Sequence, residues 1–330
     1  MEIQSVLSVA PLRISFLGGG TDIANFYEKH SGGVVSCAIN KYVYVHIKRH
    51  DPLFQEKYRI SYSDVEHTST RDSIKNSIVR SCLELLDMDE PLQISTSGDL
   101  PSNSGLGSSS SFCVALLASL HALKGENVSS AQLAEEACSV EINFLGSPIG
   151  KQDQYASAFG GMNYLHFGLN GKVGIEPILA PVDKISNFMS KIHLFWTGLS
   201  RDANSILNSQ AKRESQNTNL LLDLNSVTNR FRLDFEMDPN NFSNLGELIT
   251  QGWSIKKNLE PSILTAEISD LEEKLRKLNP LGYKLLGAGG GGFFLTIFDN
   301  PGLFESSNLS HIPKFNPKID NFGARVLSII

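Results

Sequence analysis

Hydrophobic residues recur at two different periods along the chain. Val6–Phe16 and Val34–Lys48 are rich in valine, isoleucine and tyrosine, and the run "KYVYVHIK" alternates apolar and polar residues. This period of two predicts strands, and the two segments together predict an antiparallel sheet. The runs "KIHLFWTG" and "GYKLLGAGGGGFFLTIF" return to strand character in the second half of the chain.

Helical spacing of apolar residues occurs between these strands. It is present in Ser73–Leu86 and in Ser109–Leu123. A capping-box pattern at Ser129 predicts the start of a third helix, which we expect to continue to Phe144. Helices therefore dominate the middle of the first half.

A second helical region covers residues 204–278, after the Pro-containing stretch "IEPILAPVDK" and a new strand. The mixture of strands and helices predicts an α/β or α+β protein. The change in pattern places a domain boundary near residues 183–190.

Composition and charge exclude several classes of protein. A hydrophobic content of 41% excludes disorder over most of the chain, and 29 Lys and Arg against 35 Asp and Glu make nucleic acid and anionic membranes poor partners. The most apolar stretch, Phe112–Leu123, is shorter than the roughly 20 residues of a membrane span. The chain does not open with the pattern of a secretory signal, and it has no C-x-x-C pair. We expect a cytoplasmic protein with four reduced cysteines.

The segment "LPSNSGLGSSSSFCVALLASL" places a Gly/Ser loop directly before a helix. Glycines let the backbone approach an anion, and the first turn of a helix offers N–H groups and a favourable dipole, so the layout is that of a phosphate cradle. A small-residue linker explains such a loop equally well. The segment "GSPIGKQ" has the wrong spacing for a P-loop, and the H-R-D and D-F-G motifs of protein kinases are absent.

Three further segments carry candidate chemistry. In "LGAGGGGFFL" the missing side chains indicate a close approach to the backbone, whereas a tight turn usually needs only two glycines. Arg13 and Asp22 flank a three-glycine turn, and Glu141 precedes Asp153 in "VEINFLGSPIGKQDQYASAFGG". Each acid alone is more often a solvated surface charge.

Taken in order, the segments "PLRISFLGGGTD", "LPSNSGLGSSSS", "SPIGKQDQYASAFGG" and "KLLGAGGGGFF" resemble the GHMP kinase superfamily over essentially the whole chain. Within it they look most like the D-glycero-D-manno-heptose 7-phosphate kinases, whereas galactokinases have an acid-His-x-Asp turn in place of "GGGTD". The resemblance implies an α+β fold of two domains, 1–185 and 190–330, with the active site in the cleft between them.

The resemblance also implies roles for individual residues. Asp153 would be the catalytic carboxylate that accepts the proton of the sugar hydroxyl, with Arg13 beside it and the transferring phosphoryl group. Ser109 and Glu141 would hold Mg²⁺. The ATP-binding residues would be Pro101, Ser104, Gly105, Leu106, Gly107, Ser108, Ser109 and Ser110. The substrate-binding residues would be Gly19, Gly20, Thr21, Asp22, Arg201, Gly289 and Gly290.

The implied reaction is transfer of a phosphoryl group from ATP to the anomeric hydroxyl of a small-molecule sugar phosphate, most simply heptose 7-phosphate, for nucleotide-activated heptose and surface polysaccharide synthesis. Lys256 and Lys257 are further candidates, behind Arg201, for binding the phosphate of that acceptor. Homodimer formation stays open.

The sequence departs from the heptose kinase pattern at "TQG" before Trp253, where a His-Glu-Ser triplet is usual. A kinase for another sugar, of the fucose, galactose or glucuronate type, is therefore the alternative. A non-catalytic sugar sensor is less favoured, because a sensor needs neither a metal glutamate nor a base. The sugar-like "GGGTD" turn argues against the diphosphomevalonate decarboxylase branch.

Overall fold

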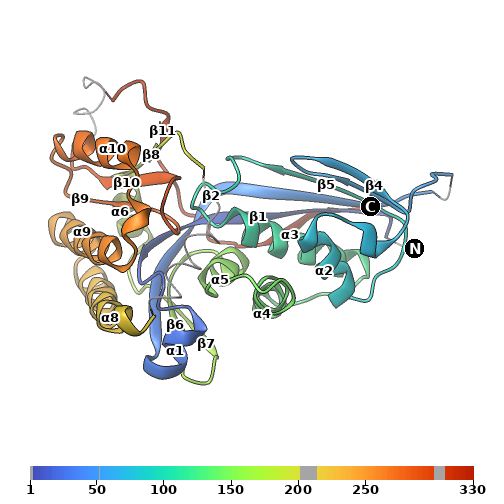
Figure 1. Cartoon of the computed structure of the whole chain (residues 1–330), viewed down its shortest axis with the longest axis horizontal. Helices are drawn as coiled ribbons and strands as arrows, with labels where there is room; N and C mark the ends of the chain where they lie inside the picture. Colours follow the sequence, from blue (N-terminus) through green and yellow to red (C-terminus); the bar gives the residue numbers. More distant parts are fainter. Residues whose placement is uncertain (1–2, 52, 201–213, 301–308) are drawn as a thin grey trace.

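The computed structural model describes residues 3–51, 53–200, 214–300 and 309–330 of the chain. Within these residues the strands form two sheets, each with helices packed against it (Figure 1). The mixture of largely antiparallel sheets and separate helices confirms the α+β prediction. No helix in the described ranges is long and apolar enough to cross a membrane.

The larger sheet has the strand order β12-β1-β2-β5-β3-β4, and β6 and β7 extend from β2. Its strands are β1 (Ser5–Leu17), β2 (Gly32–Arg49), β3 (Tyr58–Ser61), β4 (Val65–Thr68), β5 (Leu92–Gly98), β6 (Met162–Phe167), β7 (Val173–Pro177) and β12 (Arg325–Ile329). β1 pairs antiparallel with most of β2, from Ser5 opposite Lys48 to Leu17 opposite Val35. The two strands predicted from the period of two are thus confirmed.

The smaller sheet is antiparallel, in the order β11-β8-β10-β9. Its strands are β8 (Ile192–Trp196), β9 (Gly282–Leu285), β10 (Phe293–Ile297) and β11 (Lys314–Phe315). Three helices pack on this side of the molecule (Figure 1): α8 (Glu214–Met237), α9 (Phe242–Leu259) and α10 (Ala266–Arg276). The short helix η3 (Pro261–Ile263) lies between α9 and α10 in the chain.

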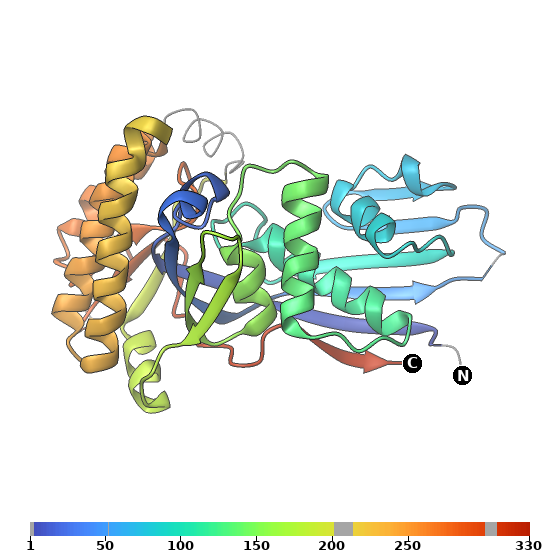
Figure 2. The same cartoon turned by 90° about the horizontal axis from the view of Figure 1, so that it is seen from below.

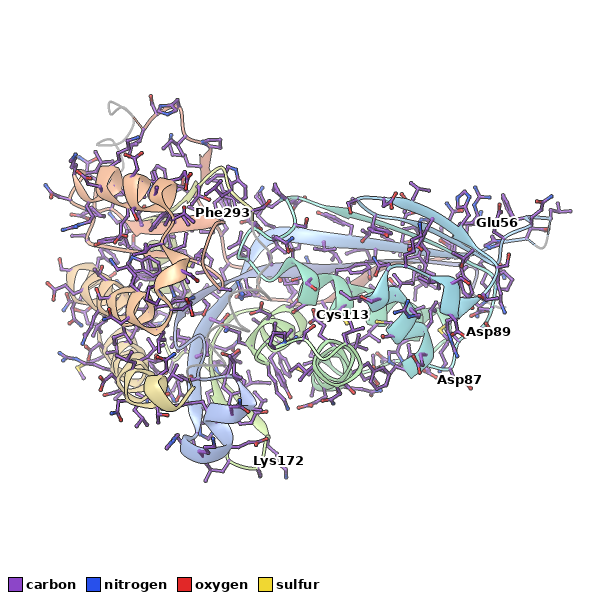
Figure 3. The ribbon with its side chains drawn as sticks, in the orientation of Figure 1. Glu56, Asp87, Asp89, Cys113, Lys172 and Phe293 are labelled. Carbon is purple, nitrogen blue, oxygen red and sulfur yellow. The ribbon has the colours of Figure 1, made fainter. Side chains whose placement is uncertain are left out.

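One face of the larger sheet is covered by α2 (Ser77–Leu85), α3 (Ser108–Leu123), α4 (Ser130–Cys138) and α5 (Gln152–Phe159) (Figure 1). The other helices in the described parts of the chain are α1 (Ala24–His30), α6 (Val182–Ser190), the short η1 (Arg71–Ser73) and the π-helix η2 (Ser139–Phe144). α3 is buried along almost its whole length, as expected of a helix that is apolar on every side. Its Cys113 lies beneath the sheet (Figure 3), and its Sγ is 3.8 Å from Sγ of Cys82. All four cysteines are buried free thiols.

The predicted third helix is only partly regular. Ser129 caps it as expected, because its Oγ accepts a hydrogen bond of 3.2 Å from the backbone N–H of Gln132. The α-helix then ends at Cys138, and the chain continues as the wider π-helix η2 (Ser139–Phe144). π-helical turns are rare in proteins, and those that do occur are often found at functional sites.

The two halves of the chain contact each other and share a sheet, so the domain boundary predicted near residues 183–190 does not separate them fully. That segment is largely helix α6, and Phe188 in it packs against Phe16 of β1 and Phe235 of α8, with ring centroids 5.7 and 5.0 Å apart. The last strand, β12, returns to pair with β1 (Figure 2), so the predicted second domain, 190–330, includes one strand of the first sheet. Pairing with a distant edge strand leaves no local signal in the sequence.

Candidate active site

A cavity of about 230 Å³ opens where the two sheets with their helices meet. Its walls come from the end of β1, the glycine turn after it, the loop and first turn of α3, η2, the start of α5, α9 and the loop after β9. Among the described residues, six charged side chains line it: Arg13, Asp22, Glu141, Asp153, Lys256 and Lys284. Segments far apart in the sequence therefore supply one polar site.

The Gly/Ser loop ends in the first turn of α3, as the cradle interpretation requires. Gly105 and Gly107 have φ angles of 79° and 75°, and Gly107 is the N-cap of the helix. These left-handed conformations suit glycine, and the turn they form lets Ser108, Ser109 and Ser110 line the cavity. The N–H groups of a first helical turn have no partners within the helix, so this end of α3 favours an anionic ligand.

The late glycine run contacts the cradle loop. A Cβ on Gly287 would lie 2.4 Å from Cα of Gly105, and one on Gly292 would lie 2.4 Å from the carbonyl oxygen of Ser104. The close approach expected from the sequence therefore exists, but its partner is the protein's own cradle. Absence of side chains lets the two loops interlock, which fixes the position of the cradle.

Arg13 and Asp153 form a bidentate ion pair at the bottom of the cradle. Nε and Nη2 of Arg13 donate to the two carboxylate oxygens of Asp153 at 2.6 and 2.7 Å, and Nη1 donates to the carbonyl of Gly105 at 2.8 Å. The Arg13 side chain is only 5% exposed, whereas that of Asp153 is 23% exposed. The fork geometry holds the carboxylate in one orientation while leaving part of it open to the cavity.

A second acid, Glu141, lies at the other side of the α3 N-terminus. Ser109 Oγ donates to its Oε1 at 2.8 Å, and Nε2 of Gln154 donates to its Oε2 at 2.6 Å. Burial raises the pKa of Glu141, although hydrogen bonds from Ser110, Ser109 and Gln154 act in the opposite direction. The π-helix η2 brings this carboxylate into the cavity wall. Among the described residues, its hydrogen bonds come from neutral groups, and no ion pair compensates its charge.

Asp22 connects the glycine turn after β1 to the start of α5. It accepts hydrogen bonds from the backbone N–H of Gly20 at 2.8 Å and from Nε2 of Gln152 at 3.0 Å. Burial raises its pKa, an effect that the bond from Gly20 opposes and the nearby charge of Asp153 reinforces. The aspartate thus orders the turn and also lines the cavity.

The cavity brings together most of the residues predicted from the sequence. Those in its wall are Arg13, Gly19, Gly20, Asp22, Gly105, Gly107, Ser108, Ser109, Ser110, Glu141 and Asp153. The wall does not include Thr21, Pro101, Ser104, Leu106, Gly289 or Gly290. Arg201 lies outside the described residues.

Physical reasons account for several of these exceptions. Thr21 is fully buried, and its hydroxyl donates to the carbonyl of Gly18 at 2.8 Å. Leu106 is a core residue, and Pro101 is exposed on the surface. Gly289 is packed so closely that a Cβ would lie 2.5 Å from Ile263, and Gly290 donates its N–H to the Ile263 carbonyl at 3.1 Å. These two glycines therefore pack the loop against Ile263, on the side away from the cavity.

Sequence reasoning overlooked part of the cavity wall. Ser15, Gln152 and Lys284 line it, and Nζ of Lys284 donates to the carbonyls of Ser15 and Phe16, both at 2.8 Å. The polar residues on either side of Asp153 in "KQDQY" were the available signal. For Lys284 no local signal exists, because it reaches across from the other sheet.

Comparison with known proteins concerns the family and the fold. The family model of the GHMP kinases N terminal domain matches residues 76–161, and that of GHMP kinases C terminal matches residues 235–305. The fold and the two matched domains are those of a family of small-molecule kinases. The chain belongs to the GHMP kinase superfamily, whose members use ATP as the phosphate donor.

Among its relatives is the D-glycero-alpha-D-manno-heptose 7-phosphate kinase of Campylobacter jejuni, 26% identical over 311 residues that make up 90% of each chain. A galactokinase of Pyrococcus furiosus is 24% identical over 88% of each chain. A solved structure described as a D-glycero-D-manno-heptose 1-phosphate kinase from Bacteriodes thetaiotaomicron has a TM-score of 0.78, with 20% identity over 98% of this chain and 99% of that one. This likeness concerns the fold.

Proposed function

We propose that this protein phosphorylates the anomeric hydroxyl of a sugar phosphate, D-glycero-D-manno-heptose 7-phosphate, using Mg²⁺ and ATP. The observation that carries the proposal is the convergence of the Arg13–Asp153 pair and the Ser109–Glu141 pair on one cavity at the N-terminus of α3. In this role the enzyme acts in the cytoplasm and supplies nucleotide-activated heptose for surface polysaccharides.

The cradle residues fit the phosphates of ATP. The first turn of α3 would bind them through backbone N–H groups, with Ser108 and Ser110 at its edge. Ser109 and Glu141 fit a magnesium ion, because both offer oxygen atoms and the buried glutamate has a charge that a cation would compensate. When bound, Mg²⁺ would neutralise charge on the phosphate oxygens.

The protein's own groups would prepare the acceptor. Asp153 would accept the hydrogen bond and then the proton of the anomeric hydroxyl, in the orientation that Arg13 imposes. Arg13 would also stabilise negative charge that develops on the phosphoryl group. Asp22, with Gln152 bonded to it, would bind another sugar hydroxyl.

A kinase for another sugar is the second candidate. Gly252 of the "TQG" departure lines the cavity, so the sequence differs from the heptose kinase pattern at a wall of the site. The relatives also include a bifunctional fucokinase/GDP-fucose pyrophosphorylase of Arabidopsis thaliana, 27% identical over 62% of this chain and 20% of the relative. Both observations concern the acceptor and leave the phosphate donor unchanged.

The test is a coupled assay of ADP release with heptose 7-phosphate, mannose, fucose, galactose and glucuronate. We expect the largest kcat/KM with heptose 7-phosphate and a product phosphorylated at the anomeric carbon, as checked by ³¹P NMR. A larger kcat/KM with an unphosphorylated sugar would replace the heptose assignment. Absence of turnover with every acceptor would favour the sensor.

A further inference from the structure

The positive charges of the cavity differ in what they already bind. Among the described residues, its cationic side chains are Arg13, Lys256 and Lys284. Arg13 directs its donors at Asp153 and the carbonyl of Gly105. Lys284 is 7% exposed and is bonded to two carbonyls at the end of β1, which ties the second sheet to the first.

Lys256 is the exception. It lies in the last turn of α9, and its ammonium group donates a hydrogen bond to the carbonyl of Gly287. No described carboxylate forms an ion pair with it. An ammonium group has three donors, so two remain for a ligand.

Lys257, the other lysine considered from the sequence, is not in the cavity wall, so the structure does not support a role for it in binding phosphate. Lys257 pairs with Glu272 at 2.8 Å, and its Nζ lies 5.5 Å from the ring centre of Trp253. One lysine therefore satisfies its charge within the second half of the molecule, while Lys256 presents its charge to the cavity. The two neighbours form a natural pair for comparison.

The environment of Lys256 is unfavourable for a cation without a ligand. Its pKa is lowered to about 8, by burial first and then by the charge of Arg13, while Asp22 and Asp153 act in the opposite direction. The pKa of Lys284 is also lowered, by burial first and then by Lys256 and Arg13. A desolvated, unpaired cation costs free energy that an anionic ligand would offset.

The position of Lys256 indicates which anion it meets. Its partner Gly287 packs directly against Gly105 of the cradle, so the ammonium group is one contact away from the loop where phosphates are expected. Gly252, one turn earlier on α9, lines the same cavity, and a Cβ there would lie 2.1 Å from Leu17 of β1. This close packing holds Lys256 over the cavity.

We propose that Lys256 binds a phosphate group in the cavity, as the anion-binding residue contributed by the second half of the chain. The proposal rests on the proposed function for the source of that phosphate. The phosphate is either the one being transferred from ATP or the one that the sugar acceptor already carries. Both offer the same dianionic oxygens to the ammonium group.

The kinetic test compares Lys256→Met with Lys257→Met. We expect Lys256→Met to lower kcat/KM by about 10- to 150-fold, the range of a charge-assisted contact, and Lys257→Met to leave it within about 2-fold. Lys256→Arg should restore part of the loss. Thermal unfolding of each variant shows whether the fold is intact.

The pattern of the loss identifies the source. An increase in KM for heptose 7-phosphate, with KM for ATP unchanged, assigns the acceptor's phosphate. A decrease in kcat together with slower ATP hydrolysis in the absence of acceptor assigns the transferred phosphate. Equal effects of Lys256→Met and Lys257→Met, or no effect of either, would overturn the proposal.

A binding measurement keeps the proposal separate from the choice of sugar. At pH 8 an amine with a lowered pKa reacts with acetic anhydride faster than ordinary lysines, so the acetylation of Lys256 in the whole protein can be followed by mass spectrometry. We expect ATP or heptose 7-phosphate to protect Lys256 at least about 5-fold relative to Lys257. Protection by ATP would support the proposal even if heptose 7-phosphate proved not to be a substrate. Protection by neither would overturn it.

Discussion

The two ends of α3 use charged residues in opposite ways. At its C-terminal end His121 is bonded to two carboxylates, Glu126 at 2.6 Å and Glu136 at 2.7 Å. At its N-terminal end Ser109 and the buried Glu141 face the cavity. Both ends contain buried titratable groups, but His121 has carboxylates of opposite charge beside it, whereas the described hydrogen bonds to Glu141 come from neutral groups.

This difference indicates that the charges at the C-terminal end of α3 serve stability, whereas Glu141 at its N-terminal end serves function. Burial opposes the charge of His121, yet its hydrogen bonds to Glu136 and Glu126 outweigh burial and raise its pKa. For Glu141 burial outweighs the hydrogen bonds from neutral groups, so its pKa is raised, away from the charged state. Ionisable groups that the fold leaves uncompensated in a cavity are typical of functional sites.

The largest expected effect is on the carboxylate beside the cradle. Asp153→Asn should lower kcat by at least about 100-fold, because general-base catalysis typically contributes 10² to 10⁴. ATP binding, measured by calorimetry, should stay nearly unchanged. Glu126→Gln, which neutralises a carboxylate at the opposite end of α3, is the control and should keep normal turnover. Near-normal kcat of Asp153→Asn under conditions where chemistry limits the rate would remove the base assignment.

Ser109 and Glu141, at the N-terminal end of α3, should affect the Mg²⁺ dependence of the rate together. Ser109→Ala and Glu141→Gln should each raise the Mg²⁺ concentration needed for half-maximal rate by about 10-fold or more. In the double variant the effects should combine to less than their product, because both residues serve one ion. Magnesium titrations of the three variants measure this. Unchanged Mg²⁺ dependence in both single variants would leave the ion with other ligands.

Two glycines test the two ends with the same substitution. Gly105 and Gly125 have nearly equal φ angles of 79° and 76°, but a Cβ on Gly105 would lie 2.8 Å from the Leu286 carbonyl, whereas one on Gly125 meets nothing within 4 Å. Both alanine variants should lose about 1–2 kcal/mol of stability from backbone strain. Gly105→Ala should in addition raise KM for ATP by about 10-fold, since a displaced cradle weakens phosphate contacts. Denaturant unfolding and initial rates measure both quantities, and an equal KM in the two variants would contradict the interlocked-loop interpretation.

The smallest effect, a change in stability, is expected at the C-terminal end of α3, where His121 is paired with two carboxylates. His121→Gln should lower the melting temperature by roughly 2–4 °C near pH 6 without changing kcat. The raised pKa of His121 means that its charge stabilises the fold fully below its unfolded value of about 6.5, and that this contribution is lost as pH rises through the folded pKa. The pKa values of Glu126 and Glu136 are lowered, so their contribution is lost at the acidic end. The difference between wild type and variant should therefore shrink as pH rises, and a difference that is constant with pH would contradict the ionic account.

Much of the local structure was predictable because its causes are local. The alternation in β2, the apolar character of α3 and the Ser129 cap depend on neighbouring residues, and these predictions are confirmed. The order of the glycine and acidic motifs also sufficed to indicate the superfamily. A run of glycines indicates that another group packs closely against the backbone, because a close approach is the main reason for several neighbouring residues to lack side chains.

The sequence by itself indicated the main strands and helices, such as β1, β2 and α3, the family, and a set of candidate site residues. Only the tertiary structure decided that the late glycines meet the cradle, that β12 completes the first sheet, and that Lys256 faces the cavity while Lys257 pairs with Glu272. The physical reason is distance along the chain. Contacts between residues a hundred or more positions apart are chosen by packing and by mutual compensation of charge, neither of which a local pattern records.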